Sequence, residues 1–271
     1  MKSGKTFRLR LLCLGAILLC MCISCGGPSP STVYDKGIKA FSKGDYASAA
    51  TYFDAIPDYL NASTYGAYSH GIVLFDQQRY AEAEPYFKDC QNFMYGKSRY
   101  EYCHACGLKE AGQWTEAAAA FNALRDYEDA APQAAYCSAR AAEDSHIYDT
   151  ALYNYEAAGE LDDAPDRLIN LQTQIYSRAC GLQEEGHYAD ALALFNVLGD
   201  YLSSESRAIE CKDASREKDY EQAEALFQAG SYEEAYVMFG SLSGYRDAAN
   251  RMEELAEILG IPTETDEDEW R

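Results

Sequence analysis

The residue types best suited to chemistry lie close together at Cys103, His104 and Cys106, a Cys-x-x-Cys pair around a histidine. Two cysteines at this spacing can form a redox disulfide or supply half of a zinc site. The other half of a zinc site would have to come from His70 or Cys137. Nothing else in the sequence shows paired ligand spacing.

Three interpretations of these cysteines remain open. Six cysteines follow Cys25, an even number that is compatible with disulfides, and Cys103 and Cys137 occupy equivalent places one repeat apart. Free cysteine is also among the most buried residue types, which favours small core side chains. A metal or redox site at Cys103 and Cys106 is the least favoured of the three, and no metal is predicted.

Catalytic signatures are absent from the sequence. The four histidines do not cluster with a Ser or Cys nucleophile, and there is no nucleotide-binding glycine loop, HExxH or nucleophile elbow. Acidic pairs are frequent because the chain holds 44 Asp and Glu, and such pairs usually mark solvated helix faces. We therefore expect neither enzymatic activity nor a cofactor.

The elements that carry these residues repeat along the chain. One aromatic residue returns at intervals of 34, 34, 34, 40 and 44 residues, with alanine three positions later and another ring seven positions later. These spacings share one face of an α-helix, which we call helix B. The aromatic positions are Tyr46, Tyr80, Trp114, Tyr148, Tyr188 and Tyr232.

A second helix, helix A, precedes each helix B. Tyrosine stands twelve residues before every aromatic, Gly or Ala nine before, and Ala or Leu six before, again on one face. Close approach of the two backbones at the small residues is expected, with rings filling the space around them. The tyrosines are Tyr34, Tyr68, Tyr102, Tyr136, Tyr176 and Tyr220.

The connections are also regular. Gly44, Gly112, Gly186 and Gly230 stand between helix A and helix B, where a residue with positive φ can end a helix. At the link to the next repeat, a residue suited to cap the new helix stands fifteen positions after the aromatic. These link residues are Asn61, Asp129, Asp163, Ser203 and Asp247; Tyr95 breaks the rule, and Ser98 is the alternative cap.

Two irregularities carry further predictions. Pro85 lies inside the second helix B and predicts a kink there. The extra residues of the last two intervals fall in 161–176 and 201–220, where they would lengthen a helix or loop.

Helix pairs of 34 residues with this pattern resemble tetratricopeptide repeats. The resemblance covers nearly the whole mature chain and implies an all-α, right-handed superhelical solenoid of about six repeats over 32–260, ending in a capping helix at 248–260. The chain departs from the family before the small residue of helix A, where the family usually has Leu, and at the link, where it usually has Pro.

The N-terminal segment predicts export. Four basic residues precede an apolar run of 13 residues, too short for a membrane-spanning helix. Residues 22–25, Cys-Ile-Ser-Cys, resemble the lipobox of bacterial lipoproteins, which implies lipidation of Cys25 and a membrane or cell-surface location. A cleaved signal without a lipid and an uncleaved anchor are the two alternatives. The predicted parts are a signal at 1–24, a flexible tether at 25–31 and an acidic disordered tail at 261–271.

Charge limits the possible partners. Without the signal, 19 Lys and Arg face 44 Asp and Glu, a net charge of −25. Such a surface repels phosphate backbones, so nucleic-acid binding is not expected. Solubility explains the charge most simply, and recruitment of a basic partner is the more specific alternative.

Two functions remain open. Lipidated members of the resembled class imply a membrane-tethered scaffold of the cell envelope that binds a protein or peptide, with the six helix A tyrosines bordering a groove or packing between helices. The alternative is a small-molecule or glycan-binding lipoprotein of an uptake or sensing system, which predicts an enclosed aromatic pocket near 161–176 and 201–220.

Overall fold

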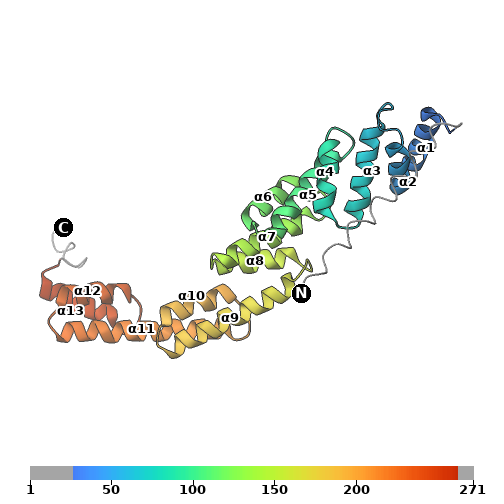
Figure 1. Cartoon of the computed structure of the whole chain (residues 1–271). Helices are drawn as coiled ribbons and strands as arrows, with labels where there is room; N and C mark the ends of the chain where they lie inside the picture. The colour runs from blue at the N-terminus through green and yellow to red at the C-terminus, as the bar shows by residue number, and fades with distance from the viewer. Residues whose placement is uncertain (1–26, 262–271) are drawn as a thin grey trace, which may run out of the picture. The chain divides into compact units, whose positions relative to one another are not determined.

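The protein is all-helical over the residues that the structure describes. The computed structural model describes residues 27–261, which form thirteen α-helices and no strand (Figure 1). In chain order these are α1 (Pro30–Ser42), α2 (Tyr46–Asp54), α3 (Ala62–Asp76), α4 (Tyr80–Asp89), α5 (Gly96–Glu110), α6 (Trp114–Leu124), α7 (Ala130–Asp144), α8 (Tyr148–Ala158), α9 (Ala164–Glu184), α10 (Tyr188–Leu198), α11 (Ser204–Gln228), α12 (Tyr232–Ser241) and α13 (Ala248–Leu259).

The helices belong to two compact units, divided between Cys137 and Ser138 inside α7. In the first unit, each helix from α1 to α5 packs against the next helix along the chain. The same rule holds from α8 to α12 in the second unit. The predicted all-α fold of consecutive helix pairs is confirmed, including the last helix α13, which ends at Leu259 with Gly260 as its C-cap. Nothing in the sequence pattern predicts this division into two units.

The predicted stripe of alanines and rings forms the core of each helix pair. The six alanines of helix B are completely buried, and so are the rings four positions after them. At Gly37 and Gly71 of helix A, a Cβ atom would lie 2.7 Å from the ring of Phe53 or Phe87. Glycine therefore allows the backbones of the first two pairs to approach this closely. The other four pairs have alanine at this position.

Each helix A ends in the same turn. In the first pair, the N–H of Gly44 donates to the carbonyl of Phe41 and the N–H of Asp45 donates to that of Ala40, the two bonds of a Schellman motif. All six pairs have this arrangement. The four predicted glycines have positive φ, as expected, but Gln78 and His146 also adopt it without being glycine.

The links between pairs contain a second left-handed residue, which the sequence did not predict. It follows an aromatic residue of the link, or Leu161 in the fourth link, and precedes the first residue of the next helix A by two positions. That first residue is always small and buried, and at Gly96 a Cβ would collide with the carbonyl oxygen of Cys90. The left-handed residues are Leu60, Met94, Glu128, Asp162, Leu202 and Arg246.

The prediction that the link residues cap the next helix with their side chains is wrong for the four links described below. Asn61, Asp163, Ser203 and Asp247 do occupy the N-cap position, but none of their side chains caps the helix by a hydrogen bond. Ser98 is not a cap either, since α5 begins at Gly96. The φ and ψ values at these N-caps lie outside the extended region in which a capping side chain reaches the backbone N–H groups.

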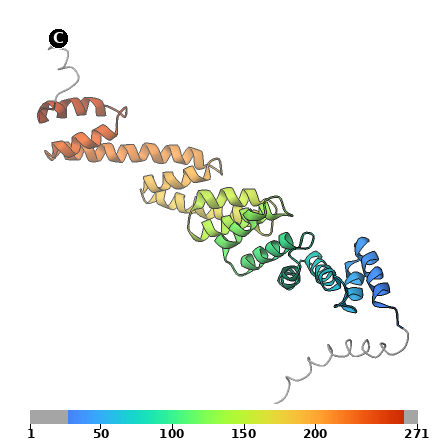
Figure 2. The same cartoon turned by 90° about the horizontal axis from the view of Figure 1, so that it is seen from above.

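The irregular stretches of the sequence lengthen helices. The extra residues extend α9 to 21 residues and α11 to 25, and α11 is the long orange helix in Figure 2. Helix α4 continues through Pro85 as one element from Tyr80 to Asp89.

The predicted signal 1–24, Cys25 and tail residues 262–271 lie outside the described residues. Within 27–261, none of the helices is both long and apolar enough to span a membrane.

Candidate functional site

The cysteines lie in the core of the helix pairs. Cys103 and Cys106 are buried in α5, and burial raises the pKa of each thiol to about 12. Thiolate formation, which metal binding and disulfide exchange require, is therefore strongly disfavoured. Among the described residues, all six cysteines are free thiols, and no three His, Cys, Asp or Glu side chains gather in a group that could hold a metal.

The six helix A tyrosines pack between helices. Tyr68, Tyr102, Tyr136 and Tyr220 are buried, while Tyr34 and Tyr176 are half-buried. Five of these rings meet the core ring of their pair edge to face, as Tyr102 meets Phe121 with 5.6 Å between ring centroids. Tyr136 meets Trp114 in the same way. The buried four present little surface to a ligand, so they favour the packing interpretation over that of a groove border.

Two of the histidines named in the sequence, His70 and His104, form contacts on the surface of the first unit. Nε2 of His70 on α3 lies 2.8 Å from a carboxylate oxygen of Asp54 on α2, and its ring stacks on Tyr86. Nδ1 of His104 on α5 lies 3.3 Å from Glu84 on α4. Both contacts join a helix A to a neighbouring helix B, which the spacing in the sequence could not reveal.

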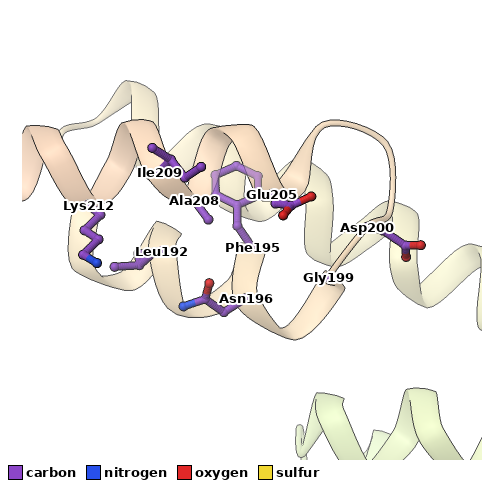
Figure 3. A pocket seen from close by; sticks show the side chains of 9 residues that line it. All are labelled: Leu192, Phe195, Asn196, Gly199, Asp200, Glu205, Ala208, Ile209 and Lys212. Atoms are coloured by element: carbon purple, nitrogen blue, oxygen red, sulfur yellow. The ribbon is translucent and has the colours of Figure 1, made fainter.

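An open groove lies between α10 and α11 in the second unit. It has a volume of about 640 Å³ and an apolar floor that includes Leu192, Phe195 and Ala208 (Figure 3). Ile209 also lines it and is 59% exposed. Figure 3 shows Lys212 at one end of the groove and Asp200 at the other. The remaining lining residues are Asn196, Gly199 and Glu205.

Two further depressions lie on the surface of α8, α9 and α10. They have volumes of about 760 and 220 Å³ and share Tyr148 and Arg178. His146 and Asp190 add polar groups, and Leu182 and Leu194 add apolar surface to the larger depression. The only aromatic side chains are those of Tyr148 and His146, so this surface differs from the enclosed aromatic pocket expected near 161–176.

The length of α11 explains why its groove is open. Buried residues of α11 fall into two groups, Ser204, Ala208 and Cys211 near its start and Tyr220 and Ala223 near its end. The second group belongs to the core shared with α12 and α13. Ten extra residues move that contact about 15 Å along the helix, which leaves the face of Ile209 uncovered by α12.

Comparison with known proteins adds no family. No protein-family model matches the chain, and no curated protein matches it. Its function is therefore inferred from its own residues.

Proposed function

We propose that this chain is a membrane-tethered, non-enzymatic scaffold of the bacterial cell envelope that binds a protein or peptide partner. The observation that supports this most directly is the open groove of α10 and α11, where the exposed Ile209 stands beside buried Phe195 and Ala208. An extended peptide or a partner helix can lay apolar side chains on such a floor.

The finer description of the fold belongs to this proposal. It is a right-handed superhelix of tetratricopeptide-like repeats, tethered through a lipid on Cys25. The agreement of six repeats in the sequence and the packing of consecutive helices in each unit support it.

Charge defines the expected partner. Asp200 and Glu205 line the groove against the single cation Lys212, and the mature chain carries a net charge of −25. A partner with basic residues beside an apolar anchor complements this surface, and salt would slow its association.

A crosslinking experiment tests the proposal. A photo-crosslinking amino acid replaces Ile209 in the full-length chain, and Ile169 on α9, 57% exposed and outside the groove, serves as the matched control. We expect one defined protein of the envelope to crosslink at position 209 and not at position 169, with a yield that falls in high salt. Equal crosslinking at both positions, or none at 209, would contradict the proposal.

The alternative function is binding of a small molecule or glycan, and the depressions that share Tyr148 and Arg178 favour it, because a ring and a planar cation can contact a sugar or its carboxylate. Retention of the chain on peptidoglycan or sugar resins, lost in Tyr148→Ala, together with no protein crosslink at 209, would support the alternative.

A further inference from the structure

One position of the repeat is occupied by arginine in four of six cases. It lies four residues after the link residue, in the first turn of helix A. The six residues at this position are Tyr65, Arg99, Gln133, Arg167, Arg207 and Arg251.

Two of these arginines are neutralised by carboxylates of the chain. Nε of Arg167 donates to Asp163 over 2.8 Å, and its Nη1 lies 3.3 Å from Glu143. Nε of Arg251 lies 2.7 Å from Glu224, and its Nη1 donates to Glu254 over 3.0 Å. Arg207 instead donates to the amide oxygen of Gln183.

Arg99 has rings where Arg167 has carboxylates. Tyr95 stands at the position of Asp163, and Phe75 stands at the position of Glu143. The centre of the guanidinium lies 5.7 Å from the Tyr95 ring centroid and 5.8 Å from that of Phe75. The ring centroids of Tyr68 and Phe87 also lie near it, at 5.5 and 6.0 Å from the centre of the guanidinium. Ring faces attract a cation, but they do not accept its hydrogen bonds as a carboxylate does.

The nitrogens of Arg99 show where an acceptor is missing. Nη1 donates to the hydroxyl of Tyr68 over 2.7 Å, whereas Nε is buried and has no acceptor. Nη2 has no hydrogen-bond partner among the described residues and is not among their buried unpaired atoms, so it reaches solvent. Its surroundings are open, because Tyr95 is 67% exposed and Met94 is 63% exposed.

We propose that Arg99, with Tyr95 beside it and the exposed Met94 next to Tyr95 in the chain, is a binding site for a carboxylate of the partner, carried next to an apolar side chain. The carboxylate accepts a hydrogen bond from Nη2 of Arg99, the guanidinium nitrogen that reaches solvent, and the apolar group covers Met94 and Tyr95. Because the chain as a whole is strongly acidic, its surface repels carboxylates on average, and a cation without a carboxylate partner, such as Arg99, offsets this repulsion locally. The contact therefore fixes the register of the partner more than its overall affinity.

Small probes test the site without any partner. The full-length chain, purified in a neutral detergent, is titrated with N-acetyl-leucine, N-acetyl-leucinamide, N-acetylglutamate α-amide and inorganic phosphate while the Arg99 Nε–H resonance is followed by NMR at 0.15 M salt. We expect saturable binding of N-acetyl-leucine with a Kd on the order of millimolar and no binding of the uncharged amide. If N-acetylglutamate α-amide binds more tightly than N-acetyl-leucine, the carboxylate belongs to an acidic side chain of the partner. If it binds more weakly, the carboxylate belongs to the C-terminus of the partner chain. Either result supports a carboxylate site at Arg99.

Three variants decide the outcome. Tyr95→Asp restores the link carboxylate inside the chain and should weaken the probe at least about tenfold while the fold is kept. Arg99→Gln should do the same, and Arg251→Gln, the control at the equivalent position, should leave binding unchanged. Wild-type binding by Tyr95→Asp, equal shifts with the amide, or tighter binding of phosphate would overturn the proposal.

The site depends on the proposed function only in assigning the carboxylate to a partner protein. A chain that binds N-acetyl-leucine but gives no crosslink at Ile209 would retain the carboxylate site and lose the proposed function.

Discussion

The hydroxyl of Tyr102 donates a hydrogen bond to a carboxylate oxygen of Asp129, 27 residues further along the chain. The same spacing joins Tyr220 to Asp247, and Tyr176 to Ser203 with 2.6 Å between their oxygens. In each case a tyrosine of helix A reaches across its helix B to the next link. Asp129 and Asp247 are therefore acceptors for tyrosine. A contact of this kind directs the side chain of Asp247 away from the N–H groups of the helix that it precedes.

Tyr102→Phe tests the energetic weight of this contact. The ring packing stays, but a hydrogen bond from a buried hydroxyl to a carboxylate is lost. We expect the free energy of unfolding to fall by about 1–2 kcal/mol in urea titrations. Tyr153→Phe, which changes an exposed tyrosine, should change it by less than about 0.5 kcal/mol. Equal values for the two variants would mean that the Tyr102–Asp129 bond contributes nothing.

Thiol reactivity should follow burial. Cys103 and Cys106 are buried, and the pKa of each is raised to about 12, while Cys180 is half-buried. Alkylation by iodoacetamide at pH 7.5, followed by peptide mass spectrometry, should label Cys180 at least about tenfold faster than the α5 pair. All three should react alike in denaturant. Fast labelling of Cys103 in the folded chain would restore the Cys-x-x-Cys pair as a reactive site.

How far the sequence could predict this fold depends on the range of each interaction. The alanine and ring positions were readable because helix geometry turns a burial requirement into a fixed spacing within one helix pair. The four glycines at the end of helix A were readable for a similar reason, since only glycine adopts positive φ without strain. Gln78 and His146 were not, because the surrounding Schellman bonds hold them in that conformation.

The candidate site was less predictable. Ile209 stands out only after the structure shows that α12 packs on the other end of α11. Arg99 is one of four arginines at its repeat position, and its missing counter-ion appears only when Tyr95 and Phe75 are placed against it. Residue type alone predicts that the link residues cap helices, whereas the tyrosines that bond to Asp129 and Asp247 lie 27 residues away in the chain.

Alkaline pH should destabilise the protein. A hydrogen bond to Asp247 raises the pKa of Tyr220 to about 12, and burial raises that of Tyr127 to about 12. The folded state keeps these protons to higher pH than the unfolded chain, whose tyrosines ionise near pH 10. The stabilisation is therefore complete below pH 10 and is lost as the pH rises towards 12. Urea titrations from pH 8 to 11, with tyrosinate absorbance as a second signal, should show this decline, and Tyr220→Phe should reduce it.

Gly71→Ala tests the close approach of the helix backbones. The new methyl would lie 2.7 Å from the Phe87 ring, which is itself completely buried and cannot move aside without disturbing the core. We expect the free energy of unfolding to fall by about 1–3 kcal/mol, since overpacking of this kind displaces the ring or the backbone. Gly107→Ala in α5 is the matched control, because no atom lies within 4 Å of its Cβ position. There the gain in helix propensity should raise the free energy of unfolding by about 0.5–1 kcal/mol. Chemical denaturation of both variants measures the two opposite signs, and a stabilising Gly71→Ala would mean that the helix pair tolerates a wider separation than the structure shows.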